Sequence, residues 1–195
     1  MEARDRQRPV PALLTVGHGT LDEDALAALL TAAGVAAVVD VRRFPGSRRH
    51  PQFRREALAD WLPRHGVAYR WEETLGGRRR GDATSPHVGL RDAAFRAYAD
   101  HMTGAAFWDA LDGVLAQARE VTTAVLCAES VWWRCHRRLV ADAALLVRAT
   151  PVLHLSHDGR RQAHPPTPTV RRDGDRLVYD RGEDRPLPGA ERRSP

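Results

Sequence analysis

This 195-residue chain contains no lysine, no asparagine and no isoleucine, and it has only two cysteines and two methionines. Arginine, alanine, glycine and proline are abundant instead, which is the usage that a GC-rich genome produces on its own. The formal net charge of +5 at pH 7 would otherwise favour a polyanionic partner such as nucleic acid. Because the arginine excess follows this bias, local arginine clusters carry more information than the global charge.

Long apolar runs are also missing from the sequence, so we expect no membrane-spanning helix and no membrane partner. The first residues, Met-Glu-Ala-Arg-Asp, lack the apolar core of a signal peptide. We therefore expect a cytoplasmic protein whose two cysteines are free thiols rather than a disulfide. The oligomeric state stays open at this point.

The length suits one domain with a substantial core. Residues 1–11 are charged and bounded by proline, which predicts a disordered tail, and residues 12–158 form a single α/β domain. Residues 159–181 form a C-terminal extension with a hairpin around an Asp-Gly-Asp turn. Residues 182–195 combine charges and prolines without an apolar pattern, which predicts a second disordered tail.

Strand and helix patterns alternate through the domain. Apolar runs predict strands at residues 13–16, 35–41, 67–71, 122–127 and 151–156. Amphipathic spacing predicts helices at residues 25–33, 54–65, 91–102, 105–119 and 139–147. Thr20 followed by Glu23 predicts a capping box for the first helix. This alternation indicates an α/β fold with a doubly wound, mostly parallel sheet of about five strands flanked by helices.

Polar side chains follow these strands directly, at the edge where the carboxyl ends of parallel strands meet. They are His18, Asp40, Arg42, Glu72, Cys127, Glu129 and His157. Because ligands of open α/β sheets bind beyond this edge, we expect them to share one pocket. The glycine-rich, charged segment 75–89 predicts a loop that either covers a binding site or is a solvated insertion.

A carboxylate pair in that pocket, Asp40 and Glu129, would supply an acid and a base or nucleophile, the equipment that cleaves a glycosidic bond. In this hypothesis one of them activates water and His18 orients it. Phosphates would be held by arginines and a base would stack on an indole; the candidates are Arg42, Arg48, Arg49, Arg54, Arg134, Arg137 and Trp133. The alternatives are a salt bridge from Asp40 to Arg42 or Arg137, solvated arginines and a packed Trp133.

Cys135 is a fourth candidate catalytic residue. It precedes a predicted helix and stands between Arg134 and His136, surroundings that favour a thiolate. Cys127, at a strand end, is also compatible with simple packing. The separation of Cys127 from Arg134 is one residue longer than the phosphate-binding loop of a cysteine phosphatase requires. We therefore do not interpret the chain as a phosphatase.

A metal site is less favoured by the sequence. The separation of the two cysteines differs from the short pairs of structural zinc sites. A site that borrows His18 or His157 remains open. We therefore expect no metal and no cofactor.

Several motifs together resemble the domain of unknown function 488 family. They are Thr15-Val-Gly-His-Gly, Val39-Asp-Val-Arg42, Phe44-Pro-Gly-Ser-Arg-Arg49, Pro51-Gln-Phe53, Leu75-Gly-Gly77, Tyr98-Ala-Asp-His-Met102, Cys127-Ala-Glu129 and Trp133-Arg-Cys-His-Arg137. The resemblance extends from about Leu14 to Tyr179. It implies a cytosolic, prokaryotic (bacterial) α/β domain and supplies no activity.

The leading functional hypothesis is an enzyme that acts on nucleic acid, with DNA favoured, or on a nucleotide, as a hydrolase or a DNA-glycosylase-like enzyme. The first alternative is a non-catalytic nucleic-acid-binding module that uses the same arginines. The second is a thiol- or metal-dependent small-molecule enzyme that uses Cys135. DNA binding that falls steeply with salt would favour the first two, and bound zinc would favour the third.

Overall fold

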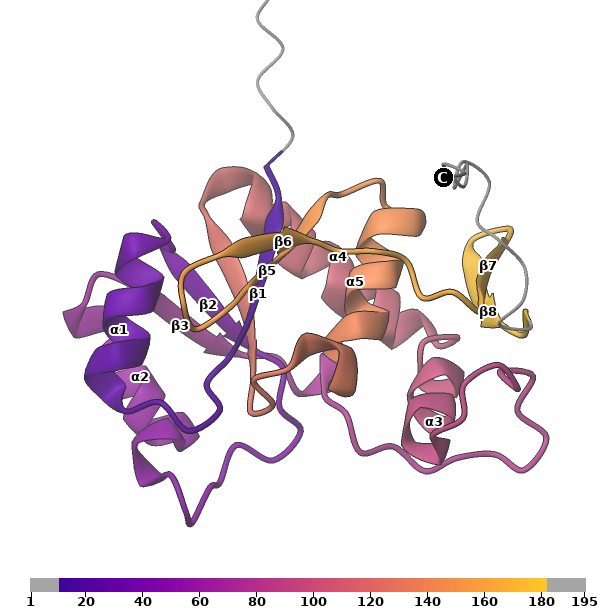
Figure 1. Cartoon of the computed structure of the whole chain (residues 1–195), viewed down its shortest axis with the longest axis horizontal. Coiled ribbons are helices and arrows are strands. Elements are labelled where there is room, and N and C mark those ends of the chain that lie inside the picture. The colour runs from indigo at the N-terminus through magenta and orange to yellow at the C-terminus, as the bar shows by residue number, and fades with distance from the viewer. Residues whose placement is uncertain (1–10, 182–195) are drawn as a thin grey trace, which may run out of the picture.

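The computed structural model describes residues 11–181, which are built around a six-stranded sheet (Figure 1). The strands are β1 (Leu13–Gly17), β2 (Ala37–Asp40), β3 (Ala68–Trp71), β4 (Thr123–Cys127), β5 (Val152–Leu155) and β6 (Arg161–Ala163), and their order is β3-β2-β4-β1-β5-β6. The first five strands are parallel, and β6 pairs antiparallel with β5. The predicted mostly parallel, doubly wound sheet is confirmed. The two expected tails, 1–11 and 182–195, lie outside the described residues except for Pro11.

Five α-helices connect the strands within the described residues. They are α1 (Glu23–Ala32), α2 (Arg55–Arg64), α3 (Ala93–His101), α4 (Ala105–Glu120) and α5 (Arg137–Leu146). The predicted capping box at Thr20 is wrong, because the carboxylate of Asp22 caps α1 and accepts from the Ala25 amide at 2.8 Å. An aspartate directly before the first helical residue reaches the free amides of the first turn. Over residues 11–181, no helix is both long and apolar enough to cross a bilayer.

Alternate side chains along each strand enter different cores, so the sheet is covered on both faces. Val38 and Leu126 belong to the core formed with α1 and α2, in which Trp61 is a large buried member. Val39 and Val125, their neighbours in sequence, belong to the core formed with α3, α4 and α5. Figure 1 shows α1 and α2 on one side of the strands and α4 and α5 on the other.

The strand order places a topological switch point beside β4. The helices that follow β1 and β2 lie on one face, whereas α5, which follows β4, lies on the opposite face. The loops after β2 and β4 therefore separate at the carboxyl edge, although the strands themselves are hydrogen-bonded neighbours. Such a separation opens the crevice in which doubly wound proteins bind ligands.

The C-terminal extension carries the predicted hairpin, β7 (Val170–Asp173) and β8 (Arg176–Tyr179), which is confirmed. Asp142 of α5 attaches it to the domain. This fully buried carboxylate accepts hydrogen bonds from the Thr167 amide and hydroxyl, from the Tyr179 hydroxyl at 3.2 Å, and from His164 at 3.0 Å. The extension is therefore part of the folded domain.

Candidate functional site

A cavity of about 390 Å³ lies at the switch point between β2 and β4. Its walls come from the loop after β2, the segment that leads into α3, α3 itself, and both ends of the β4–α5 loop. The lining residues are Arg42, Arg43, Phe44, Gly77, Arg78, Asp92, Ala94, Phe95, Tyr98, Cys127, Ala128, Glu129, Arg134, Cys135 and His136. We call it the β2–β4 cavity. Its volume is in the range of pockets that hold small organic ligands.

Two thiols and an imidazole occupy the buried part of this lining. Cys127 ends β4, and Cys135 and His136 immediately precede α5, so one loop brings all three together. The Sγ atoms of Cys127 and Cys135 lie 3.9 and 3.7 Å from His136 Nδ1. The three donor atoms all lie within 4.8 Å of one another, and both cysteines are free. We call these three residues the Cys–His cluster.

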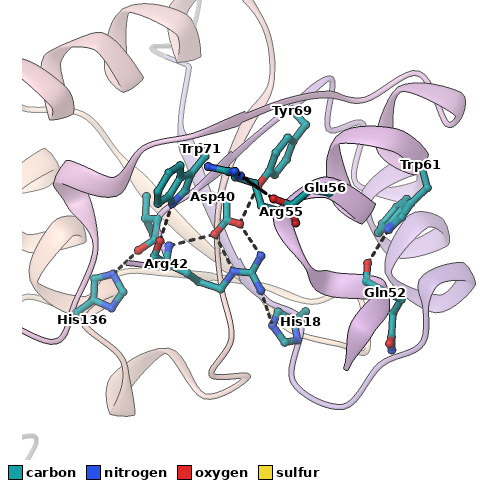
Figure 2. A network of polar contacts seen from close by, with 11 residues as sticks. His18, Asp40, Arg42, Gln52, Arg55, Glu56, Trp61, Tyr69, Trp71 and His136 are labelled. Atoms are coloured by element: carbon teal, nitrogen blue, oxygen red, sulfur yellow. Dashed lines mark hydrogen bonds and ion pairs between the residues drawn. The ribbon is translucent and has the colours of Figure 1, made fainter. Parts of the chain in front are cut away.

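Contacts on every side fix the orientation of His136. Its Nε2 lies 3.1 Å from the Val41 carbonyl oxygen, as the dashed line in Figure 2 shows. A carbonyl only accepts, so in the neutral imidazole Nε2 carries the proton and the Nδ1 lone pair faces the sulfurs. The Tyr98 ring packs against the imidazole with centroids 5.0 Å apart. A Cβ at Gly77 would lie 3.0 Å from Nδ1, so glycine there keeps space free beside this atom.

The two thiols differ in acidity because they are buried close together and each changes the pKa of the other. The neighbouring Cys127 thiol is the largest cause that lowers the pKa of Cys135 well below its ordinary value; burial opposes this, while the nearby His136 and the Arg137 guanidinium reinforce it. The proximity of Cys135, together with burial, raises the pKa of Cys127. Arg137 Nε also donates to Cys135 Sγ at 3.4 Å. Cys135 is therefore the more acidic thiol of the pair.

Arg137, expected to hold phosphate, is instead enclosed in the β4–α5 loop with only 1 % of its surface exposed. Its Nη2 donates to the Glu129 carbonyl oxygen. A Cβ at Gly17 would lie 1.9 Å from that oxygen and 2.8 Å from Arg137 Nη2. Glycine at the end of β1 is thus what lets the arginine support the loop that carries both cysteines.

Asp40, expected as one of two catalytic carboxylates, forms a buried ion pair with Arg42. Arg42 donates to it through its backbone amide at 3.0 Å, through Nε at 2.8 Å and through Nη2 at 2.5 Å, and the Tyr69 hydroxyl donates at 3.0 Å. Asp40 has no exposed surface and is not among the cavity-lining residues. Figure 2 shows the carboxylate enclosed by these donors. This is the salt-bridge alternative considered above, and it leaves Asp40 without access to a substrate.

The same ion pair determines the acidity of its neighbours. Burial disfavours the charged form of Arg42, but the hydrogen bonds and charge of Asp40 outweigh burial and raise the pKa of the guanidinium. Burial and the Asp40 charge also raise the pKa of Tyr69. Trp71 Nε1 donates to the Arg42 carbonyl oxygen at 2.7 Å. The loop that carries His136's hydrogen-bond acceptor, Val41, is thereby held in place.

His18 belongs to this network rather than to the cavity. Its Nε2 lies 3.4 Å from Arg42 Nη1, its Nδ1 lies 3.0 Å from the Gly19 carbonyl oxygen, and its ring packs 4.2 Å from the Phe53 ring. Burial, followed by the Arg42 charge, lowers the pKa of His18 to about 4. The side chain is neutral near pH 7, and it does not line the β2–β4 cavity.

Glu129 and several arginines line the exposed part of the cavity. Glu129 lies two residues beyond β4, and its Oε1 accepts from the Val131 amide at 3.1 Å. Arg43, Arg78 and Arg134 have no ion-pair partner within residues 11–181. The cavity mouth therefore presents three guanidinium groups whose charge is not compensated by a direct partner.

The remaining residues expected to bind nucleic acid lie elsewhere. Arg48, Arg49 and Arg54 are exposed on the loop after β2 and the start of α2, outside the cavity lining. Arg54 Nε donates to the Ser47 carbonyl oxygen at 3.0 Å. Trp133 is 52 % exposed and packs edge-on against Trp132. The expected single arginine cluster is thus divided between the cavity and this loop.

A family model described as "Domain of unknown function DUF488" matches residues 23–144. The chain belongs to this family. Every residue that lines the β2–β4 cavity falls within the matched range, so the cavity is a feature of the DUF488 part of the chain. The turn that carries His18 and the C-terminal hairpin fall outside it. Comparison with curated proteins and with solved structures finds no match.

Sequence reasoning left several cavity residues out of the proposed site. His136 is one of them. The sequence signal for it is its position directly before a helix and beside a cysteine. Arg43 also lines the cavity, next to Arg42, whose guanidinium pairs with Asp40. Tyr98 is a buried core residue whose ring also contacts His136. Gly77 and Arg78 come from the segment whose binding role was left open.

Proposed function

We propose that this chain is an enzyme that hydrolyses a carbon–nitrogen bond in an anionic substrate of the nucleotide class, bound in the β2–β4 cavity. One observation carries the proposal: a reactive set of two thiols and an imidazole lies at the buried end of the same cavity whose open end has unpaired arginines. As part of the proposal we assign the enzyme to the bacterial cytoplasm, a reducing compartment in which two free thiols persist.

Recognition would rest on the open end of the cavity. Arg43, Arg78 and Arg134 offer planar donors that suit phosphate oxygens. Phe44, which is 64 % exposed, and Phe95 line the same space and offer faces on which a base can stack. The cavity volume of about 390 Å³ fits one nucleotide rather than a duplex.

The position of the arginines supports one orientation of a bound nucleotide relative to the reactive groups. A phosphate held at the exposed end leaves the sugar and base to extend toward the Cys–His cluster. We therefore propose that the reaction takes place at a base or a sugar, where hydrolysis breaks a carbon–nitrogen bond. Glu129 lies on the same wall, and its carboxylate accepts the proton of the attacking water.

The test is a survey of nucleoside monophosphates and of single-stranded DNA with damaged or modified bases, with product detected by liquid chromatography. We expect one class of substrate to give a free base or a deaminated product. Glu129→Gln is expected to retain binding and to lose product by about 100-fold or more, the usual contribution of a general base. Arg134→Ala is expected to weaken binding.

Arg48→Ala is the matched control for Arg134→Ala, because it removes an exposed arginine outside the cavity. It is expected to leave turnover of a mononucleotide unchanged. If no substrate of the survey yields product, or if Glu129→Gln is fully active, the hydrolase proposal fails.

A second candidate function is nucleic-acid binding by the loop after β2. Arg48 and Arg49 are exposed, and neither forms a hydrogen bond or an ion pair within the described part of the chain. DNA binding through this loop would weaken steeply with salt and would be reduced in Arg48→Ala/Arg49→Ala, while cavity variants would leave it intact. If DNA binding is instead lost in Arg134→Ala, the DNA-binding site is the cavity and not the loop after β2.

A further inference from the structure

We propose that Cys127, Cys135 and His136 are the ligands of a zinc ion whose fourth coordination position opens into the β2–β4 cavity. Binding of the metal is inferred from geometry alone. Its role in activating water rests on the function proposed above.

The sulfur–nitrogen distances of the Cys–His cluster fit a tetrahedral zinc ion. Zinc bonds of about 2.3 Å to sulfur and about 2.0–2.1 Å to nitrogen, at tetrahedral angles, place sulfur and nitrogen about 3.6 Å apart and two sulfurs about 3.8 Å apart. The observed separations of Cys127 and Cys135 Sγ from His136 Nδ1 are 3.9 and 3.7 Å. The two sulfurs lie within 4.8 Å of each other, so they would approach by up to about 1 Å when the metal binds.

The histidine is oriented as a metal ligand requires. Zinc-bound imidazoles donate their second N–H to a carboxylate or a backbone carbonyl, which fixes the tautomer and the ring plane. His136 does this through Nε2 to the Val41 carbonyl oxygen at 3.1 Å. The lone pair on Nδ1 therefore points at the two sulfurs before any metal is bound.

Charge in the surroundings also suits two thiolates and a divalent cation. Zinc neutralises both thiolates, and Arg137 Nε donates to Cys135 Sγ at 3.4 Å from outside the ligand set. The cysteines are 8 and 5 % exposed, so bulk water is largely kept from the metal–sulfur bonds. Zinc and other thiolate-preferring metals are selected over magnesium or calcium by this donor set.

Three protein ligands and an open position are the pattern of catalytic rather than structural zinc sites. All three ligands line the cavity together with Glu129. A water molecule at the fourth position would transfer a proton to Glu129, and its oxygen would form a bond to the substrate carbon. The carbon–nitrogen bond then breaks, nitrogen keeps the electron pair, and Glu129 returns the proton to it.

The test is the metal content of the full chain, purified in the presence of a reductant and without added metal. We expect about one zinc per chain, removable by a chelator that then makes both cysteines reactive toward a thiol reagent. Cobalt added to the metal-free protein is expected to give the absorption of a tetrahedral thiolate complex. Cys127→Ser, Cys135→Ser and His136→Gln are each expected to lower bound zinc from about one per chain to near zero.

His65→Gln is the matched control, because His65 is exposed at the end of α2 and lies outside the cavity. It is expected to retain zinc. Wild-type protein that binds neither zinc nor cobalt while both thiols react freely would overturn the proposal, whatever the variants do. If zinc binds but no substrate is hydrolysed, the proposed function is contradicted and the metal site is supported. Hydrolysis that persists in chelator-treated, zinc-free protein removes the metal and leaves the function standing.

Discussion

Two buried histidines should make the stability of this protein depend steeply on pH between 7 and 5. Burial is the largest cause that lowers the pKa of His154 to about 3 and that of His18 to about 4, from an ordinary value of 6.5; the neighbouring His164 adds to it for His154 and the Arg42 charge for His18. His154 stacks on Trp132 with centroids 4.1 Å apart. In the unfolded chain both imidazoles bind a proton near pH 6.5, whereas in the folded chain they stay neutral.

Hydrogen bonds explain why His154 stays neutral. Because a carboxylate only accepts, His164 Nε2 donates to Asp142 at 3.0 Å, and its Nδ1 then accepts from His154 Nε2 at 2.9 Å. The other nitrogen of His154 accepts from the Thr15 hydroxyl at 2.7 Å. Each member of this chain already has a partner, so a proton added to His154 would be buried beside a donor.

The sign of the effect follows from the lowered pKa values. Stability is fully present above pH 6.5 and is lost as the pH falls toward 4 and 3, because only the unfolded state gains protons in that window. Each histidine costs roughly 1.4 kcal/mol per pH unit below 6.5, so each contributes about 2 kcal/mol of loss at pH 5. The two together should lower the free energy of unfolding by about 4 kcal/mol between pH 7 and pH 5.

Urea unfolding followed by circular dichroism at pH 7, 6 and 5 measures this loss. In His154→Gln the difference between pH 7 and pH 5 should shrink by about half, because one of the two proton-linked groups is gone. His65→Gln, which removes an exposed histidine, should keep the full difference. A wild-type free energy that is the same at pH 7 and pH 5, or an unchanged difference in His154→Gln, would refute the reasoning.

Four further substitutions test the packing that supports the site. Asp142→Asn should lower the free energy of unfolding by about 2–4 kcal/mol, since it removes a buried acceptor of several donors; an unchanged urea midpoint would contradict this. Gly17→Ala should prevent folding or strongly destabilise the protein, because its Cβ would lie 1.9 Å from a carbonyl oxygen. Gly113→Ala, on α4 with nothing within 4 Å of the added Cβ, should instead stabilise by about 0.5–1 kcal/mol, and calorimetry of the two variants decides. Tyr69→Phe should cost about 1 kcal/mol by removing one donor to Asp40 and should leave catalysis intact, and a loss of turnover in a folded variant would return Asp40 to the reaction.

The centre of the sheet could be predicted because β1, β2 and β4 are short apolar runs buried on both faces. Residues 37–40 and 123–127 are buried at every position, and such runs stand out in a sequence. The strand β6 was missed because all three of its residues are exposed. It pairs only with β5 at the sheet edge, so no apolar pattern marks it.

The edge of the sheet at which the candidate site lies could be predicted, but the set of side chains that line it could not. Parallel strands bring residues such as Arg42, Cys127 and Glu129 to one edge, and all three do line the cavity. Whether Asp40 faces the cavity depends on Arg42 and Tyr69 both reaching it, which is a matter of side-chain direction rather than spacing. The approach of His136 to both sulfurs depends likewise on the path of the β4–α5 loop, which no periodicity encodes.

The central claim is that Cys127, Cys135 and His136 act together at the buried end of the cavity. X-ray absorption at the zinc edge of the purified chain tests it most directly. We predict two sulfur neighbours at about 2.3 Å and two nitrogen or oxygen neighbours at about 2.0–2.1 Å, with the light-atom shell altered when a nucleotide is bound. A shell of nitrogen and oxygen alone, or of four sulfurs, would contradict it.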